Sequence, residues 1–182
     1  MSDRPHRKLS QSLRERLAGV KLFLCDVDGV LTDGAVFMGD GIETKRFNVQ
    51  DGLGLRLLQK HGIKVGWVSR RPSPATTQRA RDLKVDFLHQ ADDDKITGIQ
   101  TILAQTGLSW GEICYVGDDI VDLGALRRAG VAVAVANGIR EAKDLADYVT
   151  RAAGGHGAVR EVVELILKAQ GKWKLLIQEY TS

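Results

Sequence analysis

Short, continuous apolar runs alternate along this chain with segments of helical periodicity, and this alternation constrains the fold more than any other feature of the sequence. The first run, residues 20–27 (VKLFLCDV), ends in acidic residues and glycine, as expected for a strand buried on both faces of a parallel sheet. Further runs of this kind cover residues 63–68, 85–88, 113–116, 131–135 and 148–150. The alternation predicts a three-layer, Rossmann-like α/β fold, with helices on both faces of a parallel sheet.

The segments between these runs carry apolar residues at helical spacing. Helices are expected over residues 9–17, 51–61, 72–83, 95–105, 120–129 and 159–169. Residues 170–182 are partly apolar but show no clear period, and we expect them to form a C-terminal tail. The length suits one domain, so we expect a single domain over residues 1–182, with a flexible N-terminus over residues 1–8.

One segment departs from the alternation. Residues 35–49 (AVFMGDGIETKRFNV) form two extended runs around Gly39-Asp40-Gly41. An Asp-Gly pair between such runs is typical of a β-hairpin. We therefore expect a hairpin insertion directly after the polar loop that follows the first strand.

Composition argues against several classes of protein. The net charge of +3 is small and scattered, so we expect no nucleic-acid partner. No apolar run approaches the ~18 residues that span a bilayer, and residues 1–8 lack the apolar core of a signal peptide, so we expect no membrane association. Cys25 and Cys114 lie in apolar, strand-like runs; we expect buried free thiols, which favours a cytoplasmic protein.

Polar clusters directly follow several of the expected strands. They are Asp26-Val27-Asp28-Gly29, Ser69-Arg70-Arg71 and Asp118-Asp119. In parallel α/β sheets the ligand site lies beyond the carboxyl ends of the strands, so these clusters are expected to meet at one edge. Alone, the first cluster would be an ordinary acidic turn.

The distant carboxylates change that interpretation. Asp118, Asp119 and Asp122 follow another strand, and gathering them beside Asp26 costs on the order of several kcal/mol unless a cation is bound. An all-oxygen site favours a hard cation, and Mg²⁺ is the common choice beside a phosphate. Lys95 stands at the start of a helix, where the helix dipole disfavours a cation, so it suits a role in neutralising a carboxylate and a phosphate oxygen.

Together these residues resemble the four ordered motifs of the haloacid dehalogenase superfamily. The motifs are DVDGVLTD at 26–33, a hydroxyl residue at 69, Lys95, and GDD-x-x-D at 117–122. Over residues 20–172 the chain is similar to the 3-deoxy-D-manno-octulosonate 8-phosphate phosphatases, which belong to the capless branch of that superfamily. This similarity is carried by the hairpin, by DG-x-G at 51–54, by DYVT at 147–150 and by GG-x-GAVRE at 154–161.

The resemblance implies a phosphatase reaction through an aspartyl-phosphate intermediate. Asp26 would be the nucleophile and Asp28 the general acid and base. Mg²⁺ would be held by Asp26, by the backbone carbonyl of Asp28 and by Asp118, with Asp119 and Asp122 acting indirectly. Lys95 and Ser69 would stabilise the transferring phosphoryl group, although the Ser69 hydroxyl suits a helix cap equally well.

The substrate end is less well matched than the phosphate end. The resemblance implies a substrate site formed by Gly29, Thr32, Arg71, Asp51 and Gly52, with Arg71 meeting the sugar acid and the N–H after Asp28 binding phosphate. The family usually reads Thr-Gly-Arg where this chain has Ser69-Arg70-Arg71. Many relatives also carry Arg where this chain has Gln50 and His156. These departures affect the sugar, not the phosphatase chemistry.

Too few residues separate the motifs for a cap domain, so an open site is expected unless a partner subunit closes it. The resemblance implies a homotetramer, and we expect the hairpin to pair with copies of itself. We also expect the apolar tail to pack on its own or a neighbouring subunit, near the mouth of the site. Alternatives are a nine-carbon ulosonate 9-phosphate as substrate, a non-catalytic relative of the domain on sialic-acid cytidylyltransferases, and a phosphotransferase or mutase.

Overall fold

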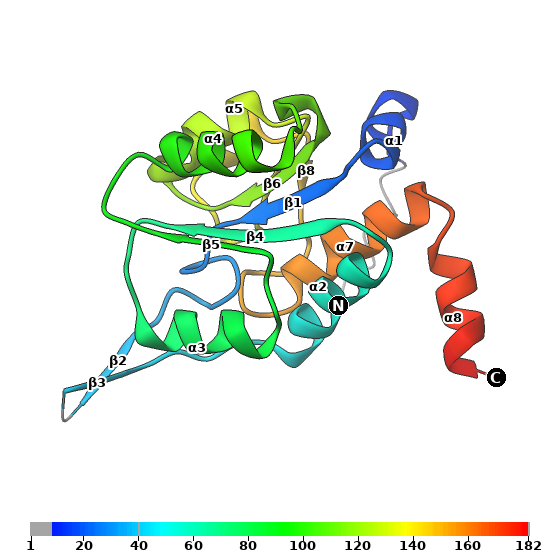
Figure 1. Ribbon diagram of the computed structural model, residues 1–182. Helices are drawn as coiled ribbons and strands as arrows, with labels where there is room; N and C mark the ends of the chain where they lie inside the picture. The colour runs from blue at the N-terminus through cyan, green and yellow to red at the C-terminus, as the bar shows by residue number, and fades with distance from the viewer. Residues whose placement is uncertain (1–8, 40, 182) are drawn as a thin grey trace.

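The computed structural model describes residues 9–39 and 41–181 (Figure 1). The flexible N-terminus expected over residues 1–8 and the central turn residue Asp40 lie outside these ranges. Within them, no helix has the length and apolar character needed to cross a bilayer.

The main sheet has six parallel strands in the order β5-β4-β1-β6-β7-β8. Their bounds are β1 (Leu22–Cys25), β4 (Lys64–Ser69), β5 (Phe87–Gln90), β6 (Ile113–Gly117), β7 (Val131–Ala134) and β8 (Tyr148–Val149). All six predicted strands are therefore confirmed. The central strands β1 and β6 are buried along their whole length, as their unbroken apolar runs predict.

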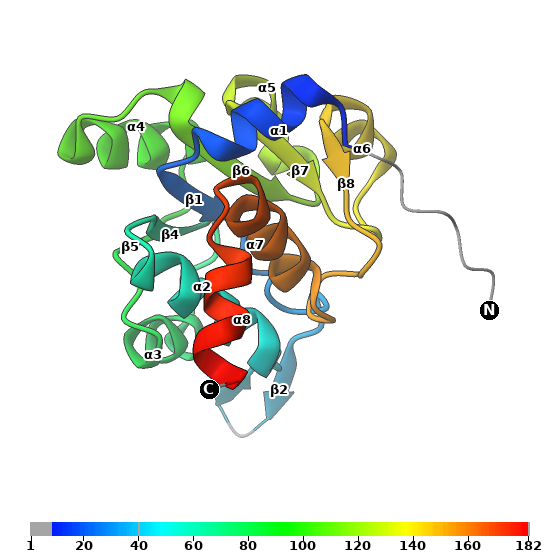
Figure 2. The same ribbon diagram turned by 90° about the vertical axis from the view of Figure 1, so that its right-hand side faces the viewer.

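Helices cover both faces of the sheet (Figures 1 and 2), which confirms the three-layer prediction. One apolar core lies between the sheet and α1 (Gln11–Ala18), α2 (Val49–Lys60), α3 (Pro74–Asp82) and α7 (Ala158–Ala169). A second core lies on the other face, under α4 (Lys95–Thr106), α5 (Leu123–Arg128) and α6 (Arg140–Leu145). The helix expected over residues 120–129 begins with a 3-10 turn, Ile120–Asp122, and the short helix α6 was not predicted.

The predicted hairpin forms a separate two-stranded antiparallel sheet of β2 (Phe37–Gly39) and β3 (Ile42–Thr44). It projects from the carboxyl edge of the main sheet, at the lower left of Figure 1. Phe37, Met38 and Ile42 are more than half exposed at its tip. The described part of the hairpin therefore offers apolar side chains to solvent.

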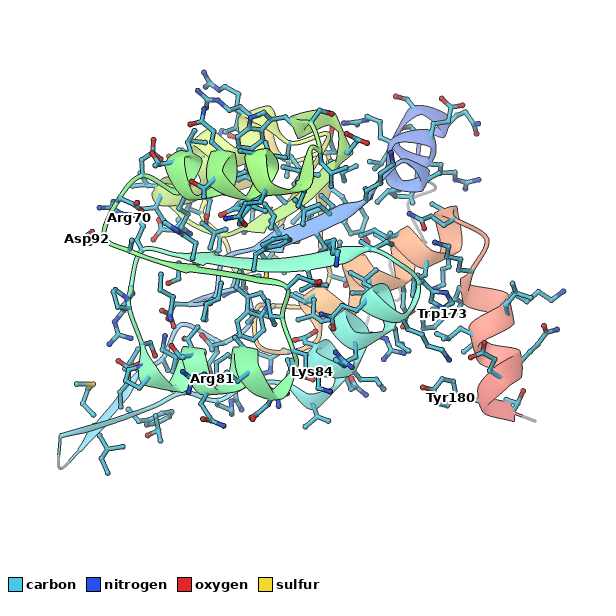
Figure 3. All side chains as sticks on the ribbon, viewed as in Figure 1. Arg70, Arg81, Lys84, Asp92, Trp173 and Tyr180 are labelled. Carbon is cyan, nitrogen blue, oxygen red and sulfur yellow. The ribbon has the colours of Figure 1, made fainter. Side chains whose placement is uncertain are left out.

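The C-terminal tail differs from its prediction, because residues Trp173–Thr181 form a regular helix, α8. Leu176 is buried, and the cationic groups of Arg160 and Lys168 lie 5.2 and 5.3 Å from the centre of the Trp173 ring. Lys172 donates to the carbonyl of His61, just before β4 begins. Figure 3 shows Trp173 and Tyr180 at the far side of the molecule from Arg70, which follows the end of β4. In this chain α8 thus packs on its own subunit, away from the carboxyl edge of the sheet; the expectation that the tail lies near the mouth of its own site is wrong.

Candidate active site

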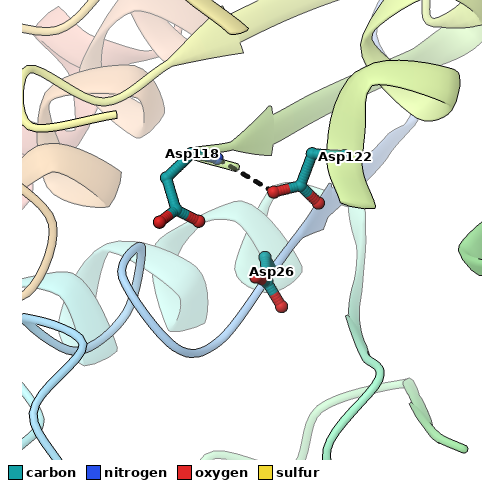
Figure 4. A group of neighbouring side chains, drawn as sticks. All are labelled: Asp26, Asp118 and Asp122. Carbon is teal, nitrogen blue, oxygen red and sulfur yellow. Dashed lines mark hydrogen bonds between the residues drawn. The ribbon is translucent and has the colours of Figure 1, made fainter. Parts of the chain in front are cut away.

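Three carboxylates meet where the adjacent strands β1 and β6 end (Figure 4). Asp26 follows β1 directly, Asp118 follows β6, and Asp122 lies in the 3-10 turn after it. One oxygen from each lies within 4.8 Å of the others. The sequence prediction that these residues gather at one sheet edge is confirmed.

Asp122 supports the cluster through hydrogen bonds, and both of its carboxylate oxygens already accept them. Oδ1 accepts hydrogen bonds from Lys95 Nζ at 2.6 Å and from the Tyr115 hydroxyl at 2.6 Å. Oδ2 accepts the backbone N–H groups of Asp118 at 2.9 Å and Asp119 at 3.2 Å. Asp122 therefore fixes the loop after β6 and the position of Lys95. Tyr115 was missed by the sequence analysis, since its position in an apolar strand indicated only packing.

Lys95 joins Asp122 to the expected nucleophile. Its Nζ lies 2.9 Å from Asp26 Oδ1, and its side chain is 1% exposed. Burial lowers the pKa of Lys95, but Asp26 and Asp122 outweigh burial and raise it above its ordinary value. The lysine predicted from its unfavourable place at a helix start is therefore a charged group held between two carboxylates.

The negative charges of the Asp26 and Asp118 carboxylates are not fully balanced by the neighbouring Lys95. Burial raises the pKa of Asp26 from 3.8 to about 7, although Lys95 opposes this shift. Burial, reinforced by Asp26 and Asp122, raises the pKa of Asp118 to about 7 as well. Asp26 is thus only partly ionised at neutral pH unless another cation lies beside it.

The donor set fits such a cation. Asp118 Oδ1 is buried and has no hydrogen-bond partner among the described residues. When ionised, the three carboxylates carry three negative charges, and the ammonium of Lys95 offsets one of them. The two that remain match the two positive charges of a divalent cation. Carboxylate oxygens are the ligands that Mg²⁺ prefers. Asp26 and Asp118 are free to ligate it, whereas Asp122 is engaged elsewhere.

Glycine allows the two acidic loops to approach each other. Gly29 has a φ of +95°, and a Cβ at this position would lie 2.1 Å from Asp118 Oδ2. Thr32, which is fully buried, accepts the N–H groups of Gly29 and Gly34 through its hydroxyl, at 3.3 and 3.2 Å. Gly29 and Thr32 therefore shape the loop after β1. Their contact with a substrate stays a prediction.

Ser69 ends β4 at the same edge, as predicted, and is 2% exposed. Its hydroxyl oxygen accepts the backbone N–H of Arg71 at 3.1 Å. Arg71 donates to Glu43 Oε2 at 2.6 Å, so this guanidinium has a carboxylate partner within the chain. Arg70 points outward and pairs with Asp92 at 2.8 Å (Figure 3).

Asp28 has a partner that sequence analysis missed. Lys45 Nζ lies 2.8 Å from Asp28 Oδ1 and 2.9 Å from Oδ2. Lys45 directly follows β3, and Glu43 lies two residues before it. Alternate residues of a strand lie on the same face, so Glu43 and Lys45 could have been predicted to share one face of the hairpin. That shared face was the signal in the sequence that both could contact the loop after β1.

Asp51 and Gly52 lie near the start of α2 and are not members of the acidic cluster. Asp51 is 1% exposed and accepts the backbone N–H groups of Arg160 at 2.7 Å and Gly157 at 3.3 Å. It therefore caps the N-terminus of α7. A Cβ on Gly52 would lie 2.6 Å from Arg79 Nη2, so this glycine makes room for a side chain of α3. Their expected contact with substrate stays a prediction.

Comparisons with known proteins agree with this site. A family model described as haloacid dehalogenase-like hydrolase matches residues 87–162. The 3-deoxy-D-manno-octulosonate 8-phosphate phosphatase KdsC of Yersinia pestis is 41% identical over 159 residues, which cover 87% of this chain and 85% of the relative. The KdsC protein of Escherichia coli BL21-DE3 is 38% identical over 165 residues, covering 90% and 88%.

Solved structures show the same fold. The 3-deoxy-D-manno-octulosonate 8-phosphate phosphatase of Moraxella catarrhalis, in complex with a magnesium ion, a phosphate ion and a KDO molecule, superposes with a TM-score of 0.90 at 40% identity, covering 92% of this chain and 97% of that one. A hypothetical protein of Xanthomonas campestris superposes over all of both chains, with a TM-score of 0.93 at 36% identity.

Proposed function

The chain belongs to the haloacid dehalogenase-like hydrolases, within the family of the 3-deoxy-D-manno-octulosonate 8-phosphate phosphatases, and from this premise we propose that it hydrolyses 3-deoxy-D-manno-octulosonate 8-phosphate to the free sugar acid and phosphate. One observation carries the proposal: Asp26, Lys95 and Asp118 converge at a single sheet edge, with Asp28 two residues beyond the nucleophile. This is a phosphoryl-transfer site built by the chain itself.

Asp26 performs the first half of the reaction. Its carboxylate oxygen attacks phosphorus, the bond from phosphorus to the sugar oxygen breaks, and an aspartyl phosphate forms. Lys95, 2.9 Å from Asp26 Oδ1, keeps the nucleophile oriented and offsets negative charge on the phosphoryl oxygens. Ser69, at the end of the neighbouring strand, offers a hydroxyl to the same group.

Asp28 transfers the proton in both steps of the reaction. It protonates the leaving sugar oxygen, then accepts a proton from the water that attacks the aspartyl phosphate, so phosphate leaves and Asp26 is regenerated. Its side chain is 22% exposed, and its buried Oδ1 has no hydrogen-bond partner among the described residues. Asp26 and Asp118, with the backbone carbonyl of Asp28, would hold Mg²⁺, which supplies the positive charge that neutralises the carboxylates and the phosphoryl oxygens.

Arg71, Gly29, Thr32, Asp51 and Gly52 remain proposals for the substrate end. Arg71 is supported best, because its guanidinium is 42% exposed and one buried nitrogen, Nη1, has no partner among the described residues. A planar guanidinium suits the carboxylate of a sugar acid. Asp51 and Gly52 would act through the shape of the α2 and α7 termini.

Asp26→Asn tests the mechanism. The amide cannot act as a nucleophile, so phosphate release from the sugar phosphate in Mg²⁺ is expected to fall by about 10⁴-fold or more, while circular dichroism and the melting temperature show an intact fold. Asp82→Asn, on the exposed side of α3, is the matched control and keeps full activity. Retained turnover by Asp26→Asn would rule out the nucleophile.

A panel of substrates tests the sugar. We expect the highest kcat/KM for the eight-carbon 8-phosphate, compared with nine-carbon ulosonate 9-phosphates and hexose phosphates. A preference for a nine-carbon substrate would replace the sugar and keep the chemistry. No Mg²⁺-dependent hydrolysis of any phosphomonoester would favour the non-catalytic alternative.

We further propose a homotetramer working in the cytoplasm. The apolar tip of the hairpin, with Phe37, Met38 and Ile42 exposed, supports pairing between copies of the chain. Cys25 and Cys114 are buried free thiols, which suits a reducing compartment. Sedimentation of a monomer at micromolar concentration would contradict the assembly.

A further inference from the structure

We propose that Lys45 is a positioning residue for the acid/base carboxylate, and that it holds Asp28 so that its free face meets the leaving oxygen of the substrate. The inference rests on the proposed function, because it assigns a partner to the residue that carries the proton. It also gives the hairpin a part in the reaction, since Lys45 directly follows β3.

The ammonium group of Lys45 is surrounded by partners within the chain. Its Nζ lies 2.8 and 2.9 Å from the two oxygens of Asp28, 3.1 Å from Thr76 Oγ1 and 3.7 Å from Glu43 Oε1. Of the three N–H donors of this lysine, one is hydrogen-bonded to Asp28 Oδ2 and one to Thr76 Oγ1, and both carboxylates lie beside the ammonium as ion-pair partners. The side chain is 0% exposed. Lys45 therefore acts on Asp28 and does not bind the sugar phosphate.

Burial makes this pairing obligatory. An ammonium removed from water is costly unless carboxylates surround it, and Asp28 and Glu43 provide them. Asp28 itself remains 22% exposed, while the ammonium behind it is closed off. Asp28 Oδ2 is thus tied to the protein by its hydrogen bond from Lys45, whereas Oδ1 is buried and has no hydrogen-bond partner among the described residues.

Glu43, the second carboxylate beside Lys45, is held in place by the loop after β4. Glu43 accepts hydrogen bonds from Arg71 at 2.6 Å and from the Ser73 hydroxyl. Thr76, on α3, is fully buried and accepts from Lys45. Three segments, namely the base of the hairpin, the loop after β4 and the start of α3, therefore hold Asp28 in one orientation.

A general acid that is misplaced slows substrates with poor leaving groups more than those with good ones. A sugar alkoxide needs a proton to leave, whereas p-nitrophenolate leaves without one. The ratio kcat/KM reports steps up to the first irreversible one, formation of the aspartyl phosphate, so later hydrolysis does not enter it. The two substrates together separate a defect at Asp28 from a defect at the phosphate site.

The test compares Lys45→Met with the wild type on 3-deoxy-D-manno-octulosonate 8-phosphate and on p-nitrophenyl phosphate. We expect kcat/KM to fall about 10²-fold for the sugar phosphate and less than about 3-fold for p-nitrophenyl phosphate. Thr76→Val, which removes one acceptor of the ammonium, is expected to show the same selectivity with a smaller loss, and it supplies the test if Lys45→Met does not fold. Lys64→Met is the matched control, because Lys64 pairs with Asp86 at 3.0 Å on the exposed surface.

Equal losses for both substrates, no loss for either, or the same selective loss in Lys64→Met would each overturn the inference. Failure of the proposed function is a separate result, because the wild-type chain would then release no phosphate from 3-deoxy-D-manno-octulosonate 8-phosphate. A selective loss confined to Lys45 and Thr76 supports the inference.

Discussion

The two lysines of the site belong to two parts of it that differ in charge balance, one at the edge of the sheet and one at the base of the hairpin. Lys95 stands among the carboxylates of Asp26, Asp118 and Asp122, so the half at the sheet edge lacks two positive charges. At the base of the hairpin, Lys45 and Arg71 balance Asp28 and Glu43. The first half therefore needs a cation from outside, and the second half is neutral by itself.

The difference follows from how each half is assembled. Residues 26 and 118 follow parallel strands whose ends must lie at one edge, so their charges are brought together by the topology and not by mutual attraction. The hairpin is an insertion, and it carries its own counter-charges to the loop that it covers. The raised pKa values of Asp26 and Asp118 mark the uncompensated half.

The sharpest test neutralises one carboxylate in each half. Asp118→Asn is expected to reduce turnover by about 10³-fold, because it removes a cation ligand. In metal-free protein at pH 8 the same change is expected to raise the free energy of unfolding by about 1–3 kcal/mol, since an unpaired buried charge is lost. Asp28→Asn leaves Lys45 without its main partner and is expected to lower that free energy by about 2 kcal/mol or more.

Denaturant titrations of both variants without added metal measure these changes. Asp33→Asn is unsuitable as a control, because Asp33 pairs with Arg46, so exposed Asp82→Asn serves again. Changes of the same sign in Asp118→Asn and Asp28→Asn would contradict the charge balance.

The second test uses pH. The pKa values of Asp26 and Asp118 are raised from 3.8 to about 7 in the folded chain, so the folded state holds protons that the unfolded state has released. The free energy of unfolding of the metal-free protein is therefore expected to fall as pH rises from about 4 through about 7. Each of the two groups contributes a slope of at most about 1.4 kcal/mol per pH unit over that range.

Because Mg²⁺ binds the ionised carboxylates, its stabilising effect is expected to be small at pH 5 and to grow until about pH 8. Melting temperatures with Mg²⁺ and with a chelator, measured at each pH, give this difference. A magnesium effect that is constant from pH 5 to pH 8 would show that the carboxylates are not short of charge.

The smallest expected effect comes from Tyr115→Phe. It removes one hydrogen bond to Asp122 while Lys95 remains on the same oxygen. We expect a stability loss of about 1–2 kcal/mol and a reduction in kcat of about tenfold, measured by thermal unfolding and by phosphate release. An unchanged kcat would show that Lys95 and the backbone N–H groups of Asp118 and Asp119 hold Asp122 in position without Tyr115.

The same contrast explains how much could be predicted from the sequence. The sheet, its helices and the meeting of Asp26, Lys95 and Asp118 follow from apolar runs and from the rule for strand ends. Lys45 was missed because its partner is set by the path of an insertion, which no periodicity of the main sheet predicts. The helix α8 was missed because neighbouring apolar residues obscure the spacing of Trp173 and Leu176, the residues that pack inward.

The position of α8 has a practical consequence. Its docking against α7 and the end of α2 places the end of the described chain on the side of the subunit opposite the carboxyl edge (Figure 1). An affinity tag, a fluorophore or a solid support attached beyond this helix would leave the subunit's own site facing solution. The hairpin tip is the less suitable point of attachment, because β3 connects it directly to Lys45.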